Sequence, residues 1–371
     1  MIQSFEIKNF RCFHKTKATD FSRINLFGGK NNAGKTALLE VLFLMGNPSN
    51  QTITNILAMR SISPEDMIKY PNNAWNNFFY QQNITNTISL DFISGDKKGN
   101  ILIKCDEIVD DFIEFIEKDR NAKDKEILDF AKTLSETDQI KSSLHINSNF
   151  DQKEQSNVYI VNYKGIKGTN IVKGNINIYL VPANVKRSNK SLTSEFAKAK
   201  LNGHYDDLLK AFKIIDKDIE SIDTLNTGGS NLYVTRKGEK PLQLSFFGDA
   251  MNKIADYILR IVNNKDSILL LDEIENGIHY ENQEEIWDLL FKLATENNVQ
   301  IFATTHSGEM IEAFKNTILK DGYQNNGSYF EMLRHKISNE ILIEKMPTYL
   351  LEDRINRKEP IRGELTNKRK G

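Results

Sequence analysis

The sequence predicts an α/β protein whose core is a parallel sheet. Residues 24–27 form a short apolar strand, followed by a glycine-rich turn and a helical stretch to about Met45. Later, the wholly apolar run 268–271 is followed by a helix-like stretch, 283–295, and a second apolar run, 299–304. Strands buried on both faces are continuously apolar, and strand–helix–strand units close with a right-handed crossover. We therefore expect these runs to be parallel strands of one sheet.

The composition is typical of a soluble globular protein, with 371 residues of which 39% are hydrophobic and 27% charged. Cys12 and Cys105 are the only cysteines, so a disulfide framework is not indicated and we expect a reducing, cytoplasmic location. No apolar run approaches about 20 residues, and stretch 1–13 lacks the apolar core of a signal peptide. We expect no membrane contact. A net charge of −1 excludes an obviously basic, nucleic-acid-binding chain.

The elements expected before and after the first core strand form a smaller β subdomain. Residues 2–10 and 14–21 have the pattern of short strands that precede 24–27. Residues 87–92 and 100–104 are two further strands joined by a polar turn, which is the pattern of a hairpin. These four strands predict an antiparallel subdomain beside the parallel core.

Two segments are predicted to be helical additions to one domain at 1–351, which a C-terminal tail at 352–371 follows. The segment 106–156 is expected to be an acidic helical insertion, because 106–138 has twelve Asp/Glu against five Lys/Arg and apolar residues at helical spacing. The segment 190–260 is expected to be a helical lobe, since apolar residues recur there at amphipathic spacing.

Basic residues concentrate between 164 and 200. This stretch has eight Lys/Arg and the single acid Glu195. A solvated face is the ordinary explanation of a charge run. The alternative is a surface that follows a phosphate backbone or an acidic partner. The residues that would form it are Lys164, Lys167, Lys173, Lys186, Arg187 and Lys190.

The turn at 29–36 has the pattern GxxxxGK[ST] between a strand and a helix. Glycines there let backbone N–H groups converge on phosphate oxygens, and the helix N-terminus adds its positive dipole end. We expect Lys35 to neutralise β- and γ-phosphate charge of bound ATP and the Thr36 hydroxyl to hold Mg²⁺. The alternative is a turn that only caps a helix. The other predicted nucleotide contacts are Gly29, Asn31, Asn32, Ala33 and Gly34.

Two acids, Asp272 and Glu273, directly follow the apolar run 268–271. A carboxylate at this point emerges at the carboxyl edge of a parallel sheet, where ligands bind. We expect Asp272 to complete the Mg²⁺ site and Glu273 to be the general base that polarises water. Adjacent acids also favour the first turn of a helix, which is the alternative. His306 follows the second apolar run, and we expect it to face the γ-phosphate; the alternative is a structural histidine.

With these motifs the sequence resembles the ABC-type ATPase heads of the RecF, SMC and OLD (overcoming-lysogenisation-defect) group over most of its length. The stretches that carry the resemblance are FEIKNFRCF, INLFGGKNNAGKTALLEVLFL, LLLDEIENGIHY and QIFATTHSGEMIEAF. It implies a P-loop NTPase fold of ABC-head type, with a parallel-core sheet, an antiparallel β subdomain and a helical lobe. It also implies a Walker A motif at 29–36, a Walker B motif ending in Asp272 with catalytic Glu273, a switch histidine at His306, and Arg11 as a nucleotide contact.

The resemblance implies two elements that face a partner subunit. The first is a D-loop at 275–277. The second is a signature segment in LQLSFFGDAMNKIADYIL, which contacts ATP bound to another subunit. Ala250 stands where relatives usually have glycine, and 252–253 replaces a basic pair. The residues that match the signature are Ser245, Gly248 and Asp249.

Two functions follow from the resemblance. OLD-type proteins carry a Toprim nuclease after the ATPase, but only about 50 residues follow Asp321, and they include no second acidic cluster. The chain therefore resembles the ATPase half of split phage-defence pairs of the PARIS type: a sensor and scaffold that forms homo-oligomers through ATP and controls a separate nuclease or toxin. The alternative is a DNA-repair ATPase that clamps DNA in the RecF or SMC manner. A transporter ATPase fits the motifs less well.

Overall fold

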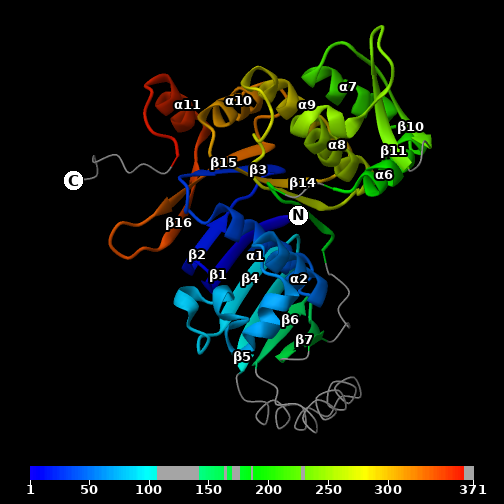
Figure 1. Cartoon of the computed structure of the whole chain (residues 1–371). Helices are drawn as coiled ribbons and strands as arrows, with labels where there is room; N and C mark the ends of the chain where they lie inside the picture. Colours follow the sequence, from blue (N-terminus) through cyan, green and yellow to red (C-terminus); the bar gives the residue numbers. More distant parts are fainter. Residues whose placement is uncertain (107–141, 163–164, 169–175, 185–186, 227–229, 363–371) are drawn as a thin grey trace.

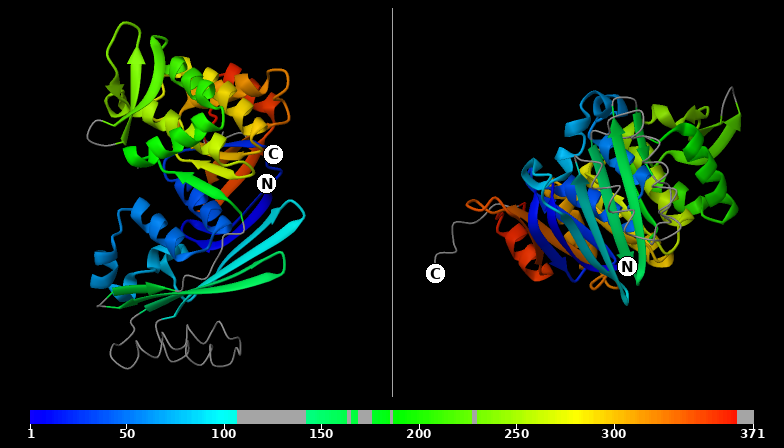
Figure 2. Two further views of the ribbon diagram at one scale, coloured as in Figure 1. Left: turned by 90° about the vertical axis from the view of Figure 1, so that its right-hand side faces the viewer. Right: turned by 90° about the horizontal axis from the view of Figure 1, so that it is seen from below.

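The computed structural model describes residues 1–106, 142–162, 165–168, 176–184, 187–226 and 230–362. These residues form a six-stranded sheet, a seven-stranded sheet and a three-stranded sheet. The two larger sheets are separate layers in Figures 1 and 2, with the seven-stranded sheet below the six-stranded one. Buried residues of helix α1 (Lys35–Gly46) share one hydrophobic cluster with strands of both layers. The glycine-rich turn lies at the start of this helix.

The six-stranded sheet has the order β16-β15-β3-β14-β13-β9, and only β15 and β16 pair antiparallel. Along β13, Leu269 and Leu271 join one hydrophobic cluster, whereas Ile268 and Leu270 join the other. The run is apolar throughout because both faces of the sheet are covered. The strands are β3 (Ile24–Gly29), β9 (Ile178–Val181), β13 (Ile268–Leu271), β14 (Gln300–Thr305), β15 (Gly327–Arg334) and β16 (Ile341–Met346).

Helices cover both faces of this sheet. On one face lie α1 and α2 (Asn50–Met59), which α3 (Pro64–Lys69) follows. On the other face lie α8 (Gly248–Asn263), α9 (Gln283–Glu296) and α10 (Gly308–Ile318), as Figure 1 shows. Helix α9 connects the parallel strands β13 and β14, as expected. No helix in the described ranges is both long and apolar enough to cross a membrane.

The seven-stranded sheet is antiparallel, with the order β2-β1-β4-β5-β6-β7-β8. The expected hairpin is β4–β5. The expected helical insertion at 106–156 is wrong for 142–156, which forms strands, because Leu144 and Ile146 pack at period two into the core below α1. Residues 107–141 lie outside the described residues. The strands are β1 (Ile2–Phe10), β2 (Phe13–Thr19), β4 (Ile88–Ser94), β5 (Lys97–Asp106), β6 (Ser142–Phe150), β7 (Lys153–Asn162) and β8 (Gly165–Gly168).

The lobe expected to be helical at 190–260 also contains strands. Ile222 and Val234 pair across a hairpin and are fully buried against the helices of the lobe. Only one face of this hairpin is apolar, and its short strands lie in the sequence between two amphipathic helices, so the sequence pattern did not indicate them. The lobe consists of α6 (Asn189–Leu201), α7 (Tyr205–Ile215), β10 (Ile219–Asn226), β11 (Ser230–Arg236), β12 (Leu242–Gln243) and α8.

The C-terminal segment packs on the core beyond the expected boundary at 351. Helix α11 (Thr348–Asn356) crosses that position, and Leu351 within it is fully buried. Further along, the buried Tyr329 hydroxyl of β15 donates a hydrogen bond to the Ile361 carbonyl. The expected tail at 352–371 is therefore wrong for 352–362, and the remaining residues lie outside the described part of the chain.

Candidate nucleotide-binding site

The turn between β3 and α1 presents backbone rather than side chains. Gly34 caps α1 with a φ of 88°, and no side chain caps this helix. A Cβ at this position would lie 2.8 Å from the Cys12 Sγ, so both the backbone angle and the packing require glycine. Asn32 has a φ of 65°, a region that asparagine tolerates. The first N–H groups of α1 thus form the anion site that a helix N-terminus offers. Of the other turn residues, Asn31 is exposed, whereas Gly29 and Ala33 are buried.

The Lys35 ammonium is drawn into the same turn. Its Nζ donates to the carbonyl oxygens of Gly29, at 2.8 Å, and Lys30, at 3.0 Å. Burial lowers the pKa of Lys35, and the carboxylates of Glu275 and Glu273 oppose this shift. A partly desolvated ammonium held by loop carbonyls has the chemistry required to bind phosphate oxygens in their place.

Asp272 is a buried carboxylate that two hydroxyls hold. The Oγ1 of Thr304 donates to its Oδ1 at 2.7 Å, and the Oγ1 of Thr36 donates to its Oδ2 at 3.1 Å. Burial raises the pKa of Asp272, and both hydrogen bonds oppose this shift. A carboxylate and a hydroxyl side by side suit Mg²⁺, which prefers oxygen ligands and takes its remaining ligands from substrate phosphates and water. Among the described residues no group of three His, Cys, Asp or Glu could hold a metal, so a protein-only metal cage is not formed.

Glu273 follows in a strained backbone conformation, with a φ of 48°. Its N–H donates to the Thr304 Oγ1 at 3.0 Å, and its Oε2 accepts from the Asn276 amide at 2.7 Å. The side chain is 37% exposed, so water reaches the carboxylate. A left-handed φ in a non-glycine residue costs about 1–3 kcal/mol and is typical of active sites. The geometry orients one carboxylate oxygen through Asn276 and leaves the other available as a base.

His306 is held near Glu273 by its contact with Glu275. Its Nδ1 is 2.8 Å from the Glu275 Oε1, and its backbone N–H donates to the same oxygen at 2.8 Å. The Nδ1 is 4.0 Å from the Glu273 Oε1. Within the expected D-loop at 275–277, Glu275 is buried and its Oε1 contacts His306 of the same chain, whereas Gly277 is exposed.

Arg11, expected to contact the nucleotide, forms an ion pair with the fully buried Glu40 of α1. Glu40 also accepts from Arg60 at 2.7 Å, and the Arg11 guanidinium lies 5.1 Å from the ring centre of Phe78. The Arg11 side chain is 12% exposed. A direct contact with nucleotide would require this buried pair to open, which costs several kcal/mol, so the structure assigns Arg11 to the support of α1.

The expected signature residues lie on the surface at the start of α8. Ser245 and Gly248 are exposed, Gly248 has a φ of 79°, and a Cβ there would meet nothing within 4 Å. Gly277 packs against this start, since a Cβ on Gly277 would lie 2.9 Å from the Ala250 nitrogen. Gly277, in the expected D-loop, and the start of α8, in the expected signature segment, therefore form one continuous surface. Asp249 is exposed on the same turn.

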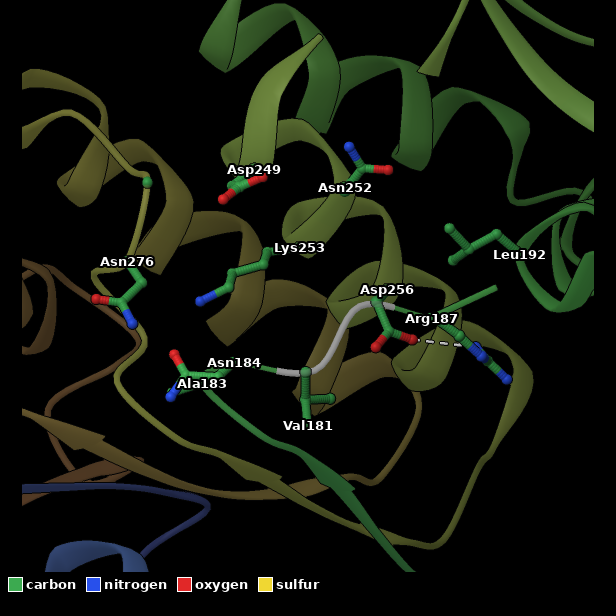
Figure 3. Close-up of a pocket in the computed structure, with 11 residues that line it drawn as sticks. Val181, Ala183, Asn184, Arg187, Leu192, Asp249, Asn252, Lys253, Asp256 and Asn276 are labelled. Atoms are coloured by element: carbon green, nitrogen blue, oxygen red, sulfur yellow. Dashed lines mark hydrogen bonds and ion pairs between the residues drawn. The ribbon is translucent and has the colours of Figure 1, made fainter. Parts of the chain in front are cut away.

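A cavity of about 330 Å³ lies behind this surface. Figure 3 shows Lys253, Asn184 and Asn276 converging on it from α8, the segment after β9 and the D-loop. Burial lowers the pKa of Lys253, and Glu273 is the first of the carboxylates that oppose this shift. Because Asn276 lines the cavity and also binds Glu273, the cavity adjoins the proposed base.

Sequence reasoning missed two residues of this site. Thr304 ends the run 299–304 that is predicted to be an apolar strand, and a hydroxyl at the end of a buried run indicates a polar partner. Arg362, whose Nη1 donates to the His306 carbonyl at 2.6 Å, lay in the segment expected to be a tail.

Comparisons with known proteins agree with this geometry. Residues 24–312 match the family model described as "AAA domain, putative AbiEii toxin, Type IV TA system". A Helicobacter pylori protein named "ATP/GTP phosphatase" is 24% identical over 355 residues, which cover 89% of this chain and 92% of that protein. The "Uncharacterized protein MJECL10" of Methanocaldococcus jannaschii is 46% identical over 44 residues, 12% of this chain and 20% of the relative.

Solved SMC head domains are similar at low identity. The SMC head bound to the C-winged helix domain of ScpA has 11% identity and a TM-score of 0.47, covering 93% of this chain and 98% of that one. The Thermotoga maritima SMC head has 10% identity and a TM-score of 0.41, covering 93% and 99%. These scores are low, so the fold assignment rests on the family match and the sheet topology. The expected P-loop NTPase fold of ABC-head type is confirmed.

Proposed function

The chain belongs to the AAA-domain family described as putative AbiEii toxin of type IV toxin–antitoxin systems, and from that membership we propose a Mg²⁺-dependent ABC-type ATPase that assembles through ATP. The chain is an enzyme that hydrolyses nucleoside triphosphate, in keeping with the name of its Helicobacter relative. The proposal concerns which residues perform the reaction and what the assembly controls.

The proposal gives each step of hydrolysis a side chain. The turn amides and Lys35 bind the phosphates, and Glu273 accepts a proton from the attacking water. His306, which Glu275 orients, is proposed to contact the γ-phosphate. Mg²⁺ held by Thr36 and Asp272 would neutralise phosphate charge when bound. These roles are supported by the hydrogen bonds that join the Walker A hydroxyl, the Walker B acids and the switch segment.

One observation carries the assembly proposal: the start of α8 is exposed and capped by no side chain, and a Cβ on Gly248 would meet nothing within 4 Å. A helix N-terminus of this kind binds phosphate, and the resemblance assigns it to ATP held by another subunit. Phe246 and Tyr280 border this surface and are 71% and 61% exposed. Exposed aromatic side chains beside a phosphate-binding helix suit a protein partner. ATP would thus bridge two copies, and hydrolysis would release them.

The assembly is proposed to be a sensor and scaffold that controls a separate effector, a nuclease or toxin, in anti-phage defence. The family description, which refers to a toxin–antitoxin system, supports this context. Co-purification with the products of neighbouring genes, in the presence of a non-hydrolysable ATP analogue, tests it. Recovery of a nuclease or toxin supports the proposal, and recovery of the chain alone argues against it.

The alternative, a DNA clamp, gains little from the basic stretch 164–200. Arg187 pairs with Asp256 at 3.0 Å, and Lys200 pairs with Asp223 at 3.4 Å. These charges are used within the chain rather than offered to a phosphate backbone. Lys164, Lys173 and Lys186 lie outside the described residues. Salt-sensitive stimulation of the ATPase by DNA would favour the clamp over the scaffold.

The catalytic assignment is tested with Glu273→Gln. Loss of a general base lowers the rate about 10²–10⁴-fold, so this variant should bind ATP, hydrolyse it slowly and accumulate dimers or larger assemblies on a sizing column. Glu344→Gln, at an exposed glutamate of β16, is the matched control and should behave as wild type. A Glu273→Gln protein that stays monomeric with and without ATP would refute assembly through ATP.

The nucleotide site itself is tested with Lys35→Ala. Removal of the ammonium leaves phosphate charge without its main counter-charge, so ATP affinity should be lost. Calorimetric titration with ATP and ADP measures the change. Unaltered affinity would contradict the P-loop assignment.

A further inference from the structure

The segment after α11 is tied to the sheet beside the P-loop. Arg354 of α11 contacts Glu331 of β15 at 3.2 Å, and Tyr329 of the same strand donates to the Ile361 carbonyl. Tyr329 also lies against β3, since a Cβ on Gly28 would be 2.1 Å from its hydroxyl oxygen. Gly28 immediately precedes the glycine-rich turn. Ile361 is therefore fixed next to the strand that delivers the P-loop.

This anchorage brings the next side chain, Arg362, to the backbone of His306. Its Nη1 donates to the His306 carbonyl at 2.6 Å, and the residue is otherwise exposed. Its positive charge contributes to lowering the pKa of Lys35, which places the two cations within electrostatic range of one another. Two cations within electrostatic range of one another repel, and an anion bound near both would relieve that repulsion.

We propose that Arg362 is a nucleotide-contacting residue that binds the outer phosphate of ATP from within the same chain. The inference deepens the proposed function, on which it rests. A guanidinium presents several N–H donors in a planar fork, and the His306 carbonyl occupies only one side of it. Within the described residues no other hydrogen bond of Arg362 is present, so its other donors can bind phosphate oxygens in the bidentate manner that arginine favours. Phosphoryl-transfer enzymes use an arginine supplied in cis in this way.

The test compares Arg362→Ala, Arg362→Lys and the control Arg357→Ala. Arg357 follows the last residue of α11, is 65% exposed and pairs with Asp353 of that helix at 2.9 Å. Loss of a charged hydrogen bond predicts a decrease of roughly ten- to a hundredfold in kcat/KM for ATP in Arg362→Ala. Binding of a non-hydrolysable ATP analogue should weaken while ADP binding stays unchanged, because ADP lacks the outer phosphate. Arg362→Lys keeps the charge without the fork and should recover part of the activity, and Arg357→Ala should match wild type.

Two results would overturn the inference. Arg362→Ala kinetics equal to those of Arg357→Ala would show that the guanidinium does not reach the nucleotide. Equal loss of ADP and ATP-analogue binding, together with a lowered Tm, would reduce Arg362 to a structural tie. The Lys35→Ala variant distinguishes failure of the Arg362 inference from failure of the proposed nucleotide site. If that variant retains full ATP affinity, the P-loop assignment and this inference both fail; if it loses ATP affinity, the outcome for Arg362 stands on its own.

Discussion

Replacement of Thr304 by valine tests whether one hydroxyl couples Asp272, the proposed metal ligand, to Glu273, the proposed general base. The Thr304 Oγ1 donates to Asp272 and accepts the backbone N–H of Glu273, at 2.7 Å and 3.0 Å. The residue is fully buried. Valine is close to threonine in size but lacks the hydroxyl, so the main effect of the change is the loss of these two hydrogen bonds.

The magnitude follows from those two bonds. A hydrogen bond to a charged group contributes about 1.5–3 kcal/mol, and a buried N–H left without an acceptor costs about 1–3 kcal/mol. Glu273 is partly exposed and water reaches it, so the cost of leaving its N–H without a protein acceptor is expected to be at the low end of this range. We expect Thr304→Val to lower the free energy of unfolding by about 2–4 kcal/mol. Because the hydroxyl also orients a proposed metal ligand, Mg²⁺ affinity should fall about 10–100-fold.

Urea unfolding followed by circular dichroism measures the first effect, and ATPase rate against Mg²⁺ concentration measures the second. Thr304→Ser keeps the hydroxyl and is the matched control, which should restore Mg²⁺ dependence close to wild type. If Thr304→Val and wild type require the same Mg²⁺ concentration, the hydroxyl does not orient Asp272 for metal, and the reasoning fails.

Two further predictions concern pH and assembly. Burial raises the folded-state pKa of Asp272, so its contribution to stability is fully present below the unfolded-state pKa of about 3.9 and is lost as pH rises through the higher folded-state pKa. Asp272→Asn should therefore raise Tm at neutral pH, with the gain shrinking toward pH 4, while Mg²⁺-dependent ATPase activity is abolished; a lower Tm at neutral pH would contradict this. Phe246→Glu should prevent ATP-dependent assembly on a sizing column yet leave ATP binding intact, whereas Tyr349→Glu, at an exposed residue of α11, should assemble normally. Normal assembly of Phe246→Glu would exclude this surface from the interface.

The regions where prediction failed share a physical cause. Segment 142–156 was expected to be helical because it adjoins an acidic stretch with helical spacing, but its strands are fixed by pairing with β5. The hairpin β10–β11 was missed for a similar reason, since its apolar face is defined by packing against the helices α6 and α7. Strand formation depends on partners distant in sequence more than helix formation does. The boundary at 351 failed because the anchor of the C-terminal segment, Tyr329, lies 32 residues before its partner Ile361.

By itself the sequence determined the parts of the site that are local. The P-loop requires only a strand, glycines at set positions, a lysine and a helix, all within 24–45, and the Walker B acids require only an apolar run before them. The tertiary structure decided which side chains meet. Pairing of Leu271 with Ala303 brings Asp272 beside Thr304, and packing of the C-terminal segment on β15 brings Arg362 to His306. Such contacts depend on strand register and long-range packing, which local spacing does not encode.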